Sequence, residues 1–497
     1  MSTNLSKSLY CMGVQCPKML WMKKHRPELF DDSVMNEAVL KTGLAVGDLA
    51  MGLFGEYREV PYGDLTDMIA ETEKLLAEGV ENIAEASFSY DGMFCSVDIL
   101  RVPGDGRVEL YEVKSSTSVH DIYYHDVAYQ VYVLEQLGFR VEKACLVHLN
   151  RDYVRGEALE IDKLFTVADL TETVRGMQPG VEERTRALKE LILRKEEPEK
   201  GLGKHCFDPY DCGFWGHCAE KLPCRNVFQV SGMQLRTKCK YYDQGIVSFE
   251  DLAAAAKLND AQRMQISYEL RELGDHIDTG SIASFLETLS YPLYFLDFES
   301  FQPAVPLYEN SRPFDQIVFQ YSLHCIETAG GELKHKEYLA WPGKDPRWEL
   351  AEQLCRDIPM GVCTLAYNMT FEKTRIRELA ELYPDLEEHL MDIFYNIRDL
   401  MVPFQKKQYY NRAMQGSYSI KYVLPALFPD DPALDYHNLE GVHNGTEASA
   451  AFAEMETLSK EELLACRENL LKYCGLDTFA MVKIWKKLQE AARTATV

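Results

Sequence analysis

Apolar and polar residues alternate through residues 97–114 (VDILRVPGDGRVELYEVK), which predicts two β-strands joined by a turn at Pro-Gly-Asp-Gly. Apolar positions at helical spacing through residues 120–138 predict a helix that ends at a glycine, and residues 142–150 predict a third strand. Helical periodicity also extends through three flanking segments, residues 34–54, 64–86 and 160–198. The first half of the chain is therefore predicted to be an α/β domain.

The second half begins with an apolar strand at residues 291–300 (YPLYFLDFES). Two further strands, residues 317–327 and 332–341, predict an antiparallel start to a mixed sheet. The pattern then continues with a helix at residues 346–357, a strand at residues 362–368 and a long helix at residues 459–492. The second half of the chain is therefore predicted to be a second α/β domain.

Residues 225–290 lie between the two halves and have a helical pattern interrupted by glycines. One helix is predicted to open at Ser248, with Glu250 and Asp251 in its first turn. We favour a helical spacer as the interpretation of this segment. The alternative is a degenerate helix-hairpin-helix, a module that binds backbone phosphates at a helix N-terminus.

Composition narrows the class of protein. The chain has 497 residues, of which 46% are hydrophobic and 26% charged, and these values are typical of a globular protein with two or three domains. No apolar run approaches the length of a membrane span, and the N-terminus lacks a signal-peptide core, so we expect a cytoplasmic protein without a membrane partner. A formal net charge of −25 excludes a general basic coat for nucleic acid. Any contact with phosphates must be local or mediated by metal ions.

The first candidate site lies on the predicted strand pair. Asp98 is near the start of the first strand, and Glu112 and Lys114 lie two residues apart on the second, so their side chains share one face. Two carboxylates can hold a divalent metal, and a lysine can stabilise charge on a phosphate or orient a water molecule. The alternative is a solvated strand face with an ordinary salt bridge.

The chain contains 14 cysteines, and without an export signal these favour metal ligation over a disulfide framework. Four of them are each separated by five residues, at positions Cys206, Cys212, Cys218 and Cys224. Chance burial of free thiols is the less favoured interpretation, because such thiols rarely cluster so densely. Four local thiolates would suit Zn²⁺, whereas an iron–sulfur cluster would take a ligand from the far N-terminus, Cys16 or Cys11.

Asp98, the Glu112-Val113-Lys114 motif and Gln130 on the following helix together resemble the PD-(D/E)XK core of RecB-type nucleases. One early Cys-Pro and three late cysteines resemble the iron–sulfur branch of that group, which includes CRISPR-associated exonucleases and AddB-type helicase–nucleases. The match covers about residues 5–224.

This resemblance implies a metal-dependent nuclease site on Asp98 and Glu112, assisted by Lys114 and Gln130. It also implies a structural iron–sulfur cluster of the [4Fe–4S] type, with Cys11 and Cys224 as spare cysteines. The implied cluster ligands are Cys16, Cys206, Cys212 and Cys218. Relatives often place a histidine after the valine of the GLAVGDLA helix, and this chain lacks it. We therefore expect weaker metal binding at the first site.

Candidate acidic residues also occur on the predicted strands and helices of the second half. Asp297 and Glu299 lie at i and i+2 on its first strand, so both carboxylates face one side. Glu372 follows a later strand-to-helix junction, and Tyr473 and Asp477 lie four residues apart on the last helix. Each pattern is weak alone. Their order along the chain is more specific.

That order resembles the DEDD exonucleases of the RNase H-like fold, the group of the DnaQ proofreading subunit, in the subgroup with tyrosine in the last motif. The match covers about residues 290–492, and Glu372 stands where the group usually has aspartate. The resemblance implies removal of nucleotides in the 3′-to-5′ direction with Mg²⁺ or Mn²⁺, with Tyr473 orienting the attacking water. The implied metal ligands are Asp297, Glu299, Glu372 and Asp477.

Together these patterns predict three segments of an α/β chain: a PD-(D/E)XK restriction-endonuclease-like domain with the cysteine cluster, a helical connector, and an RNase H-like mixed-sheet domain. Their boundaries are residues 1–224, 225–290 and 291–497. The whole chain resembles an uncharacterised bacterial family in which a RecB-like nuclease with cysteines is fused to a DnaQ-like exonuclease.

The expected function is a metal-dependent nuclease that hydrolyses DNA or RNA, single-stranded or with free ends. The chain lacks a P-loop, so degradation of a duplex would require a helicase partner or frayed ends. Two alternatives come from other classes of protein. One is a non-catalytic nucleic-acid-binding or assembly subunit, and the other is a redox-sensing iron–sulfur protein.

Overall fold

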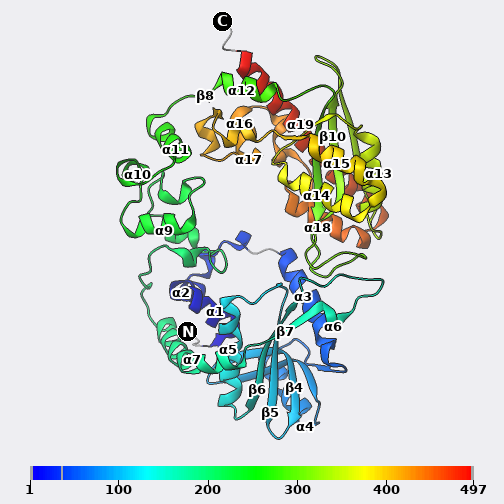
Figure 1. The fold of residues 1–497 in the computed structure, drawn as a ribbon. Helices are drawn as coiled ribbons and strands as arrows, with labels where there is room; N and C mark the ends of the chain where they lie inside the picture. The colour runs from blue at the N-terminus through cyan, green and yellow to red at the C-terminus, as the bar shows by residue number, and fades with distance from the viewer. Residues whose placement is uncertain (1–3, 35–36, 494–497) are drawn as a thin grey trace. The chain divides into compact units, whose positions relative to one another are not determined.

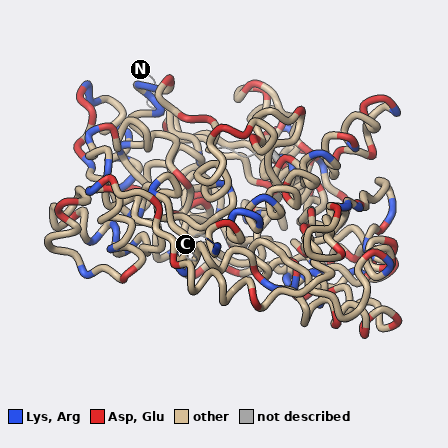
Figure 2. Tube along the Cα trace, turned by 90° about the horizontal axis from the view of Figure 1, so that it is seen from above, with Lys and Arg blue, Asp and Glu red and all other residues tan. Residues whose placement is uncertain are grey.

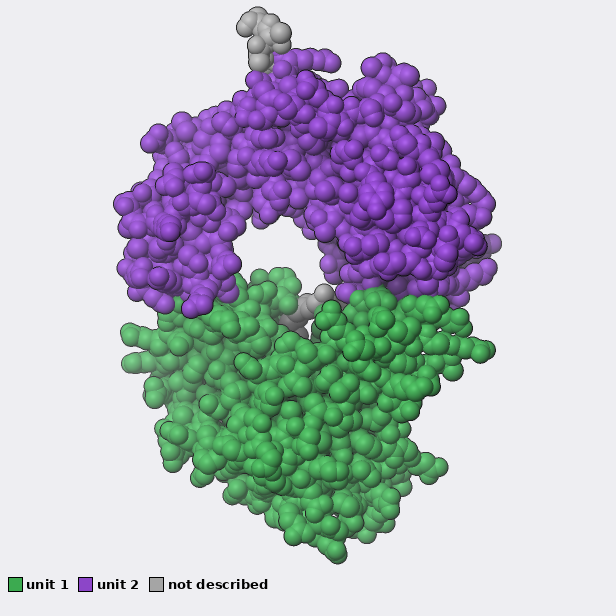
Figure 3. All heavy atoms as spheres, viewed as in Figure 1, with its two compact units in different colours: residues 1–221, 303–315 green, residues 222–302, 316–497 purple. Residues whose placement is uncertain are grey.

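A computed structural model describes residues 4–34 and 37–493 of the chain. The chain divides into two compact units, drawn in different colours in Figure 3. The first contains residues 1–221 and 303–315, and the second contains residues 222–302 and 316–497. Each unit is α/β and has its own mixed β-sheet (Figure 1).

The sheet of the first unit has seven strands in the order β2-β3-β4-β5-β6-β7, with β1 paired to one end of β4. Their bounds are β1 Leu5–Ser6, β2 Arg58–Glu59, β3 Asn82–Tyr90, β4 Met93–Gly104, β5 Arg107–Lys114, β6 Arg140–Leu149 and β7 Phe165–Asp169. Strands β4 and β5 form the predicted antiparallel pair. Strand β6 runs parallel to β5, and helix α5 makes the crossover that a parallel pair needs.

Helices cover both faces of this sheet. They are α1 Lys7–Gln15, α2 Pro17–His25, α3 Glu37–Met51, α4 Leu65–Ala77, α5 Asp121–Gln136, α6 Ile161–Leu164, α7 Thr171–Ile192 and α8 Trp215–Ala219. Adjacent residues of β4 point to opposite faces, so Leu100 belongs to the core formed with α1, α2, α4, α5 and α7, whereas Ile99 belongs to the core formed with α3 and α6. The fold is therefore a sheet between two helical layers.

Two helical predictions in this unit are partly wrong. Residues 82–86, predicted as the end of a helix, belong to β3, and residues 165–169 form β7. In β3, Ala84 and Ala86 both pair with β4 in one unbroken register, while Glu85 between them has a φ of 55° and makes no pair with β4. Pairing with a long neighbouring strand outweighs the helical preference of alanine.

The second unit contains a five-stranded sheet in the order β11-β10-β9-β12-β13. Its strands are β9 Leu293–Phe301, β10 Ile317–Ile326, β11 Leu333–Leu339, β12 Cys363–Ala366 and β13 Ile397–Asp399. Strands β9, β10 and β11 are antiparallel, and β12 and β13 continue the sheet parallel to β9. The predicted mixed sheet with an antiparallel start is confirmed. A separate short pair joins β8 His276–Ile277 to β14 Tyr409–Tyr410.

Helix α19 (Lys460–Arg493) is the long final helix, and it packs along β9 and β10 through Leu476, Ala480 and Ile484. The opposite face is covered by α13 Arg347–Asp357, α14 Thr370–Leu382 and α15 Glu387–Asn396. The other helices of this unit are α9 Leu235–Asp243, α10 Phe249–Ala255, α11 Asp260–Arg271, α12 Thr279–Leu286, α16 Val402–Gln405, α17 Ile420–Leu427 and α18 Gly445–Glu454. Helix α10 opens at Ser248, as predicted, and Asp251 completes a capping box there.

Charge does not collect in one segment of the chain. Figure 2 shows acidic and basic residues interspersed along the trace, with 78 acidic against 53 basic residues in total. Among the described residues, no helix has both the length and the apolar content needed to cross a membrane.

Candidate functional sites

Four carboxylates expected from the sequence converge in the second unit. Asp297 and Glu299 project from the same side of β9, Glu372 lies in the first turn of α14, and Asp477 lies on α19. Glu299 is 7% exposed and Glu372 only 2%. Buried acids at this density need hydrogen bonds, protons or a cation. The cluster is therefore a candidate metal centre.

A thiol belongs to the same cluster. One oxygen each of Asp297 and Glu299 and the Cys474 sulfur all lie within 4.8 Å of one another. Across residues 4–34 and 37–493, this is the one place where three or more such donor atoms meet that closely. Sequence analysis did not single out Cys474, although it follows Tyr473 directly.

Burial is the largest influence on the ionisation of these acids. Burial and the charges of Asp477 and Glu299 raise the pKa of Asp297 well above its ordinary value. Burial raises the pKa of Glu372 to about 8, with Asp399 adding to the shift. Burial also raises the pKa of Asp477 to about 6, although hydrogen bonds from Tyr436 and Tyr473 partly offset it. A divalent cation would favour the ionised form of every member.

Glu372 also provides a direct test of whether the cluster fits a metal ion. Its Oε2 is buried and has no hydrogen-bond partner among the described residues. Oxygen donors, and carboxylates above all, are what Mg²⁺ and Mn²⁺ prefer. The donor set fits a hard divalent cation.

The local fold explains how Glu372 reaches the cluster. Strand β12 ends at Ala366, and Asn368 adopts a left-handed conformation with a φ of 69° before α14 begins. The backbone N–H of Asn368 donates to Asp399 Oδ1 over 3.0 Å, which ties the junction to the end of β13. Glu372 follows this turn, in the first turn of α14, where its charge acts on Asp297 and Glu299 of β9.

Two tyrosines border Asp477. Tyr473 lies one helical turn before it on α19, as the sequence predicted, and its hydroxyl lowers the Asp477 pKa. Tyr436, in the 3₁₀ turn η9 (Tyr436–Asn438), donates from its hydroxyl to Asp477 Oδ1. No spacing links residue 436 to the carboxylate motifs, so sequence reasoning missed it.

The structure also brings together the four residues expected at the first site. Glu112 is central: Lys114 Nζ donates to its Oε1 over 2.6 Å, and Gln130 Nε2 donates to its Oε2 over 2.7 Å. Asp98 lies on the neighbouring strand, where its Oδ2 accepts from the Val113 N–H over 2.6 Å. Strands β4 and β5 and helix α5 therefore build one polar site.

Two residues of this first site were not predicted. Lys7, on α1, donates to the same Glu112 Oε1 over 2.7 Å. Asp126 accepts from Lys114 over 2.7 Å and from Gln130 over 3.1 Å. Asp126 was detectable, because it lies one helical turn before Gln130 on α5. Lys7 is 105 residues from Glu112 and gives no local signal.

These contacts set the charges of the first site. Burial and the nearby charge of Glu112 raise the pKa of Asp98 to about 7. Burial opposes ionisation of Glu112 as well, but Lys114 and Lys7 outweigh it and hold the Glu112 pKa below its ordinary value. Glu112 is therefore ionised and already neutralised by two ammonium groups.

Metal binding at the first site depends on whether Glu112 can exchange a nitrogen donor for a cation. Both oxygens of Glu112 are engaged by nitrogen donors, so a cation would have to displace an ammonium group from it. Other oxygen donors are present: Gln130 Oε1 is buried without a hydrogen-bond partner among the described residues. Glu85 also feels the charges of Lys7 and Glu112, and burial raises its pKa.

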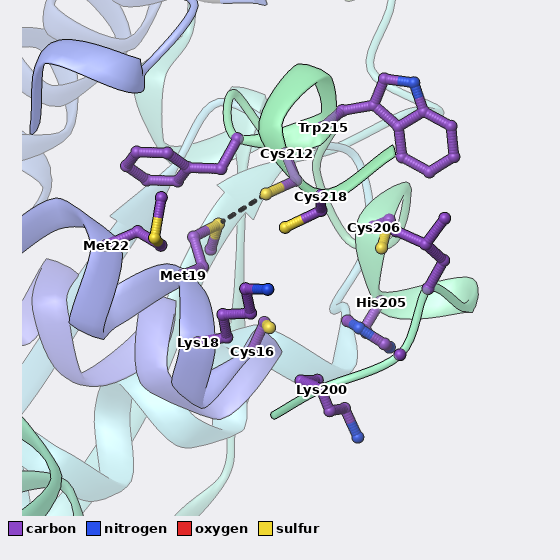
Figure 4. A pocket seen from close by; sticks show the side chains of 13 residues that line it. Cys16, Lys18, Met19, Met22, Lys200, His205, Cys206, Cys212, Trp215 and Cys218 are labelled. Carbon is purple, nitrogen blue, oxygen red and sulfur yellow. Dashed lines mark hydrogen bonds between the residues drawn. The ribbon is translucent and has the colours of Figure 1, made fainter. Parts of the chain in front are cut away.

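Four of the cysteines line one small cavity, shown in Figure 4. They are the four implied as cluster ligands, Cys16, Cys206, Cys212 and Cys218. The spare residues lie elsewhere: Cys224 is exposed, and Cys11 is close enough to Asp126 and Lys114 to be affected by their charges. The fold thus brings Cys16, rather than Cys11, to the cavity that three of the late cysteines line.

Long-range contacts bring Cys16 to the later cysteines. Cys16 lies in extended conformation between α1 and α2, where it caps both helices. The neighbouring Gln15 donates from Nε2 to the carbonyls of His205 and Tyr210, over 2.9 and 2.7 Å. Burial, with the nearby thiols, raises the pKa of Cys212 to about 11. A cation in the cavity would stabilise the thiolates.

Comparisons with known proteins relate part of this chain to sequences without an assigned activity. A protein family described as "Domain of unknown function (DUF2779)" matches residues 294–419, which include Asp297, Glu299 and Glu372 but end before Asp477. The chain is 29% identical over 234 residues to an uncharacterized protein of Ureaplasma parvum serovar 3, covering 42% of this chain and 33% of that protein. It is 24% identical over 215 residues to an uncharacterized protein of Mycoplasma genitalium, covering 39% of this chain and 32% of that protein. The chain spans about a third of the length of these relatives. The first three carboxylates of the cluster therefore lie inside a recognised domain whose function is unknown.

Proposed function

We propose that this protein is a metal-dependent nuclease and that the carboxylate cluster of the second unit is its principal site. One observation carries the proposal: Asp297, Glu299, Glu372 and Asp477 converge from three elements, with an unpartnered buried oxygen on Glu372. The sheet order β11-β10-β9-β12-β13 supports an RNase H-like fold of the DEDD exonuclease type. Tyr473 beside Asp477 supports the subgroup with tyrosine in its last motif.

The chemistry follows from what each residue offers. Asp297, Glu299, Glu372 and Asp477 would hold Mg²⁺ or Mn²⁺, which supplies Lewis-acid stabilisation of the charge that develops on a phosphodiester. The Tyr473 hydroxyl would orient a water molecule for attack on phosphorus. The P–O3′ bond then breaks, and the products are a nucleoside 5′-monophosphate and a strand shortened by one residue with a free 3′ hydroxyl.

We propose a second nuclease site of the PD-(D/E)XK type in the first unit, formed by Asp98, Glu112, Lys114 and Gln130. Lys114 is anchored between Glu112 and Asp126, where it would face a bound phosphate. The competing function is a binding platform without catalysis. It is favoured by the engagement of both Glu112 oxygens, which leaves this carboxylate less open to a metal.

We also propose that the cysteine cavity holds an iron–sulfur cluster of the [4Fe–4S] type rather than Zn²⁺. In a tetrahedral zinc site, Zn–S bonds of about 2.3 Å keep the sulfurs about 3.8 Å apart. Among the described residues, no three of the cysteine sulfurs lie within 4.8 Å of one another. This wider spacing suits a larger cluster. Its role would be structural, joining the N-terminal helices to the Cys206–Cys218 loop.

The principal site is tested with protein purified anaerobically and single-stranded DNA and RNA labelled at the 5′ end, with Mg²⁺ or Mn²⁺. We expect stepwise shortening from the 3′ end by the wild type, and its loss in Asp297→Ala and in Asp477→Ala. Glu468→Ala is the matched control, because Glu468 lies on α19 as well, with its side chain 66% exposed in an ion pair with Lys472. Equal activity in all four proteins would exclude this site.

A further inference from the structure

Cys474 is the one member of the carboxylate cluster that the proposed hydrolysis does not use. It is fully buried on α19, and its sulfur lies 3.8 Å from both the backbone oxygen and Oδ2 of Asp297. Mg²⁺ and Mn²⁺ take oxygen ligands, so a thiol at this place adds nothing to their binding. Thiophilic ions respond to it differently, because sulfur is the donor they bind most strongly.

The thiol is already placed for shared ligation. Its sulfur and one oxygen each of Asp297 and Glu299 are mutually within 4.8 Å. A second observation comes from Glu372, whose charge acts on both Asp297 and Glu299 and whose Oε2 is buried without a hydrogen-bond partner among the described residues. Strand β9 and helix α19 pack directly on one another, so the three donors are held by regular elements rather than by a loop.

We propose that Asp297, Glu299 and Cys474 form a site for a thiophilic divalent cation, with Zn²⁺ as the physiological candidate, and that its occupation inhibits the nuclease. This inference rests on the function proposed above, because it regulates the same carboxylates. On binding, the Cys474 thiol releases its proton to solvent and a sulfur–metal bond forms, with no change of oxidation state. Asp297 and Glu299 are then committed to one ion held at the thiolate, and they are lost to Mg²⁺ or Mn²⁺.

The direct test is spectroscopic. Co²⁺ is added to protein purified anaerobically with its cysteine cavity filled, and the thiolate-to-cobalt charge-transfer band in the near ultraviolet is recorded. The wild type should give this band, Cys474→Ser should lack it, and Zn²⁺ should abolish it in the wild type. Cys466→Ser is the matched control, since Cys466 lies on the same helix with its sulfur beside the Ala451 carbonyl. A band of equal strength in all three proteins, or in none, would overturn the proposal.

A second variant covers the case in which Cys474→Ser does not fold. Asp297→Asn keeps the thiol and removes one charged ligand, and it should weaken Co²⁺ binding, by about tenfold or more. Unchanged Co²⁺ affinity in this variant would count against the proposal as well.

The regulatory arm compares inhibition of 3′-end degradation by Zn²⁺, with each protein normalised to its own zinc-free rate. We expect Cys474→Ser to require about tenfold to hundredfold more Zn²⁺ for half inhibition than Cys466→Ser. Equal sensitivity would overturn the inhibitory role. If no exonuclease activity is found in any protein, the proposed function fails, whereas the cobalt band still decides whether the metal site exists.

Discussion

Two buried glutamates, Glu112 and Glu372, differ in their hydrogen bonds and in how their charge is compensated. Glu112, 1% exposed, accepts hydrogen bonds from Lys7, Lys114 and Gln130, and its charge is neutralised within the fold. Glu372, 2% exposed, has one oxygen without a partner among the described residues, and burial with Asp399 raises its pKa to about 8. Glu112 is stable as it stands, whereas the ionised form of Glu372 needs a cation.

At the residue scale, we predict a pH-dependent loss of stability caused by Glu372. Its pKa rises from the ordinary 4.5 to about 8 on folding, so the folded state retains a proton that the unfolded state has lost. The stabilising effect is complete below pH 4.5 and disappears as the pH rises through about 8. A tenfold change in proton affinity corresponds to roughly 1.4 kcal/mol, and the total effect is a few kcal/mol at most.

The measurement is the free energy of unfolding of metal-free protein between pH 5 and pH 9. Glu372→Gln should lose less stability over this range than the wild type and should be the more stable protein at pH 9. Saturating Mg²⁺ should remove most of the difference, because it stabilises the wild type, with all four carboxylates, more than the variant. Glu468→Gln serves as the control, and parallel curves for the wild type and Glu372→Gln would refute the prediction.

At the scale of elements, helix α1 joins two parts of the first unit. Its first residue, Lys7, contacts Glu112, and its C-terminal end is Gln15, which is bonded to the loop that carries the late cysteines. Strand β1, directly before α1, pairs with the first residues of β4, the strand that carries Asp98. Movement of this one helix would therefore affect both the cysteine cavity and the first site.

We predict that Lys7→Met strengthens Mn²⁺ binding at the first site. Removing one ammonium group leaves Glu112 Oε1 with Lys114 alone, so a divalent cation meets less competition. In an Asp297→Ala background, which weakens the second site, affinity for Mn²⁺ followed by electron paramagnetic resonance should rise by about tenfold. The gain should vanish when Asp98→Ala is added.

Lys24→Met is the control for that experiment, because Lys24 lies on α2 and its ammonium bonds the Asn4 carbonyl instead of the polar site. Weaker Mn²⁺ binding in Lys7→Met than in Lys24→Met would mean that Lys7 assists metal binding rather than competing with it.

The cysteine cavity should act as a staple between distant elements. Cys16 and Cys206 are separated by most of the first unit, so a shared cluster closes a long loop and restricts the unfolded chain. Cys16→Ser should lower iron and labile sulfide to background and destabilise the first unit, while leaving the unfolding transition of the second unit in place. Cys224→Ser, at an exposed position, should retain the metal. Stoichiometric zinc without iron would show that the cavity is a zinc site.

At the scale of the whole molecule, the question is whether the two sites act independently. Circular single-stranded DNA offers no 3′ end to the second site, so any cutting of circles must come from the first. We expect weak cutting, greatest in Mn²⁺, that is lost in Glu112→Gln while 3′-end degradation of linear DNA continues. Circles that stay intact at every metal concentration would identify the first unit as a binding platform.

Local patterns predicted much of both units. The sequence predicted that Glu112 shares a strand face with Lys114, and that Asp297 shares one with Glu299, because side chains alternate between the two faces of a strand. The same reasoning failed at residues 82–86, where pairing with β4 outweighed a helical pattern. Local periodicity carries no information about a neighbouring strand that supplies the missing hydrogen bonds.

The sequence by itself therefore determined the secondary structure of most elements and the types of donor available to each site. Only the tertiary structure decided which charges compensate one another. It brought Lys7 to Glu112 across 105 residues, selected Cys16 over Cys11 for the cavity, and placed Tyr436 and Cys474 against the second carboxylate cluster. The physical reason is that spacing along the chain reports faces within one element, whereas neutralisation depends on contacts between elements that close only when the core is packed.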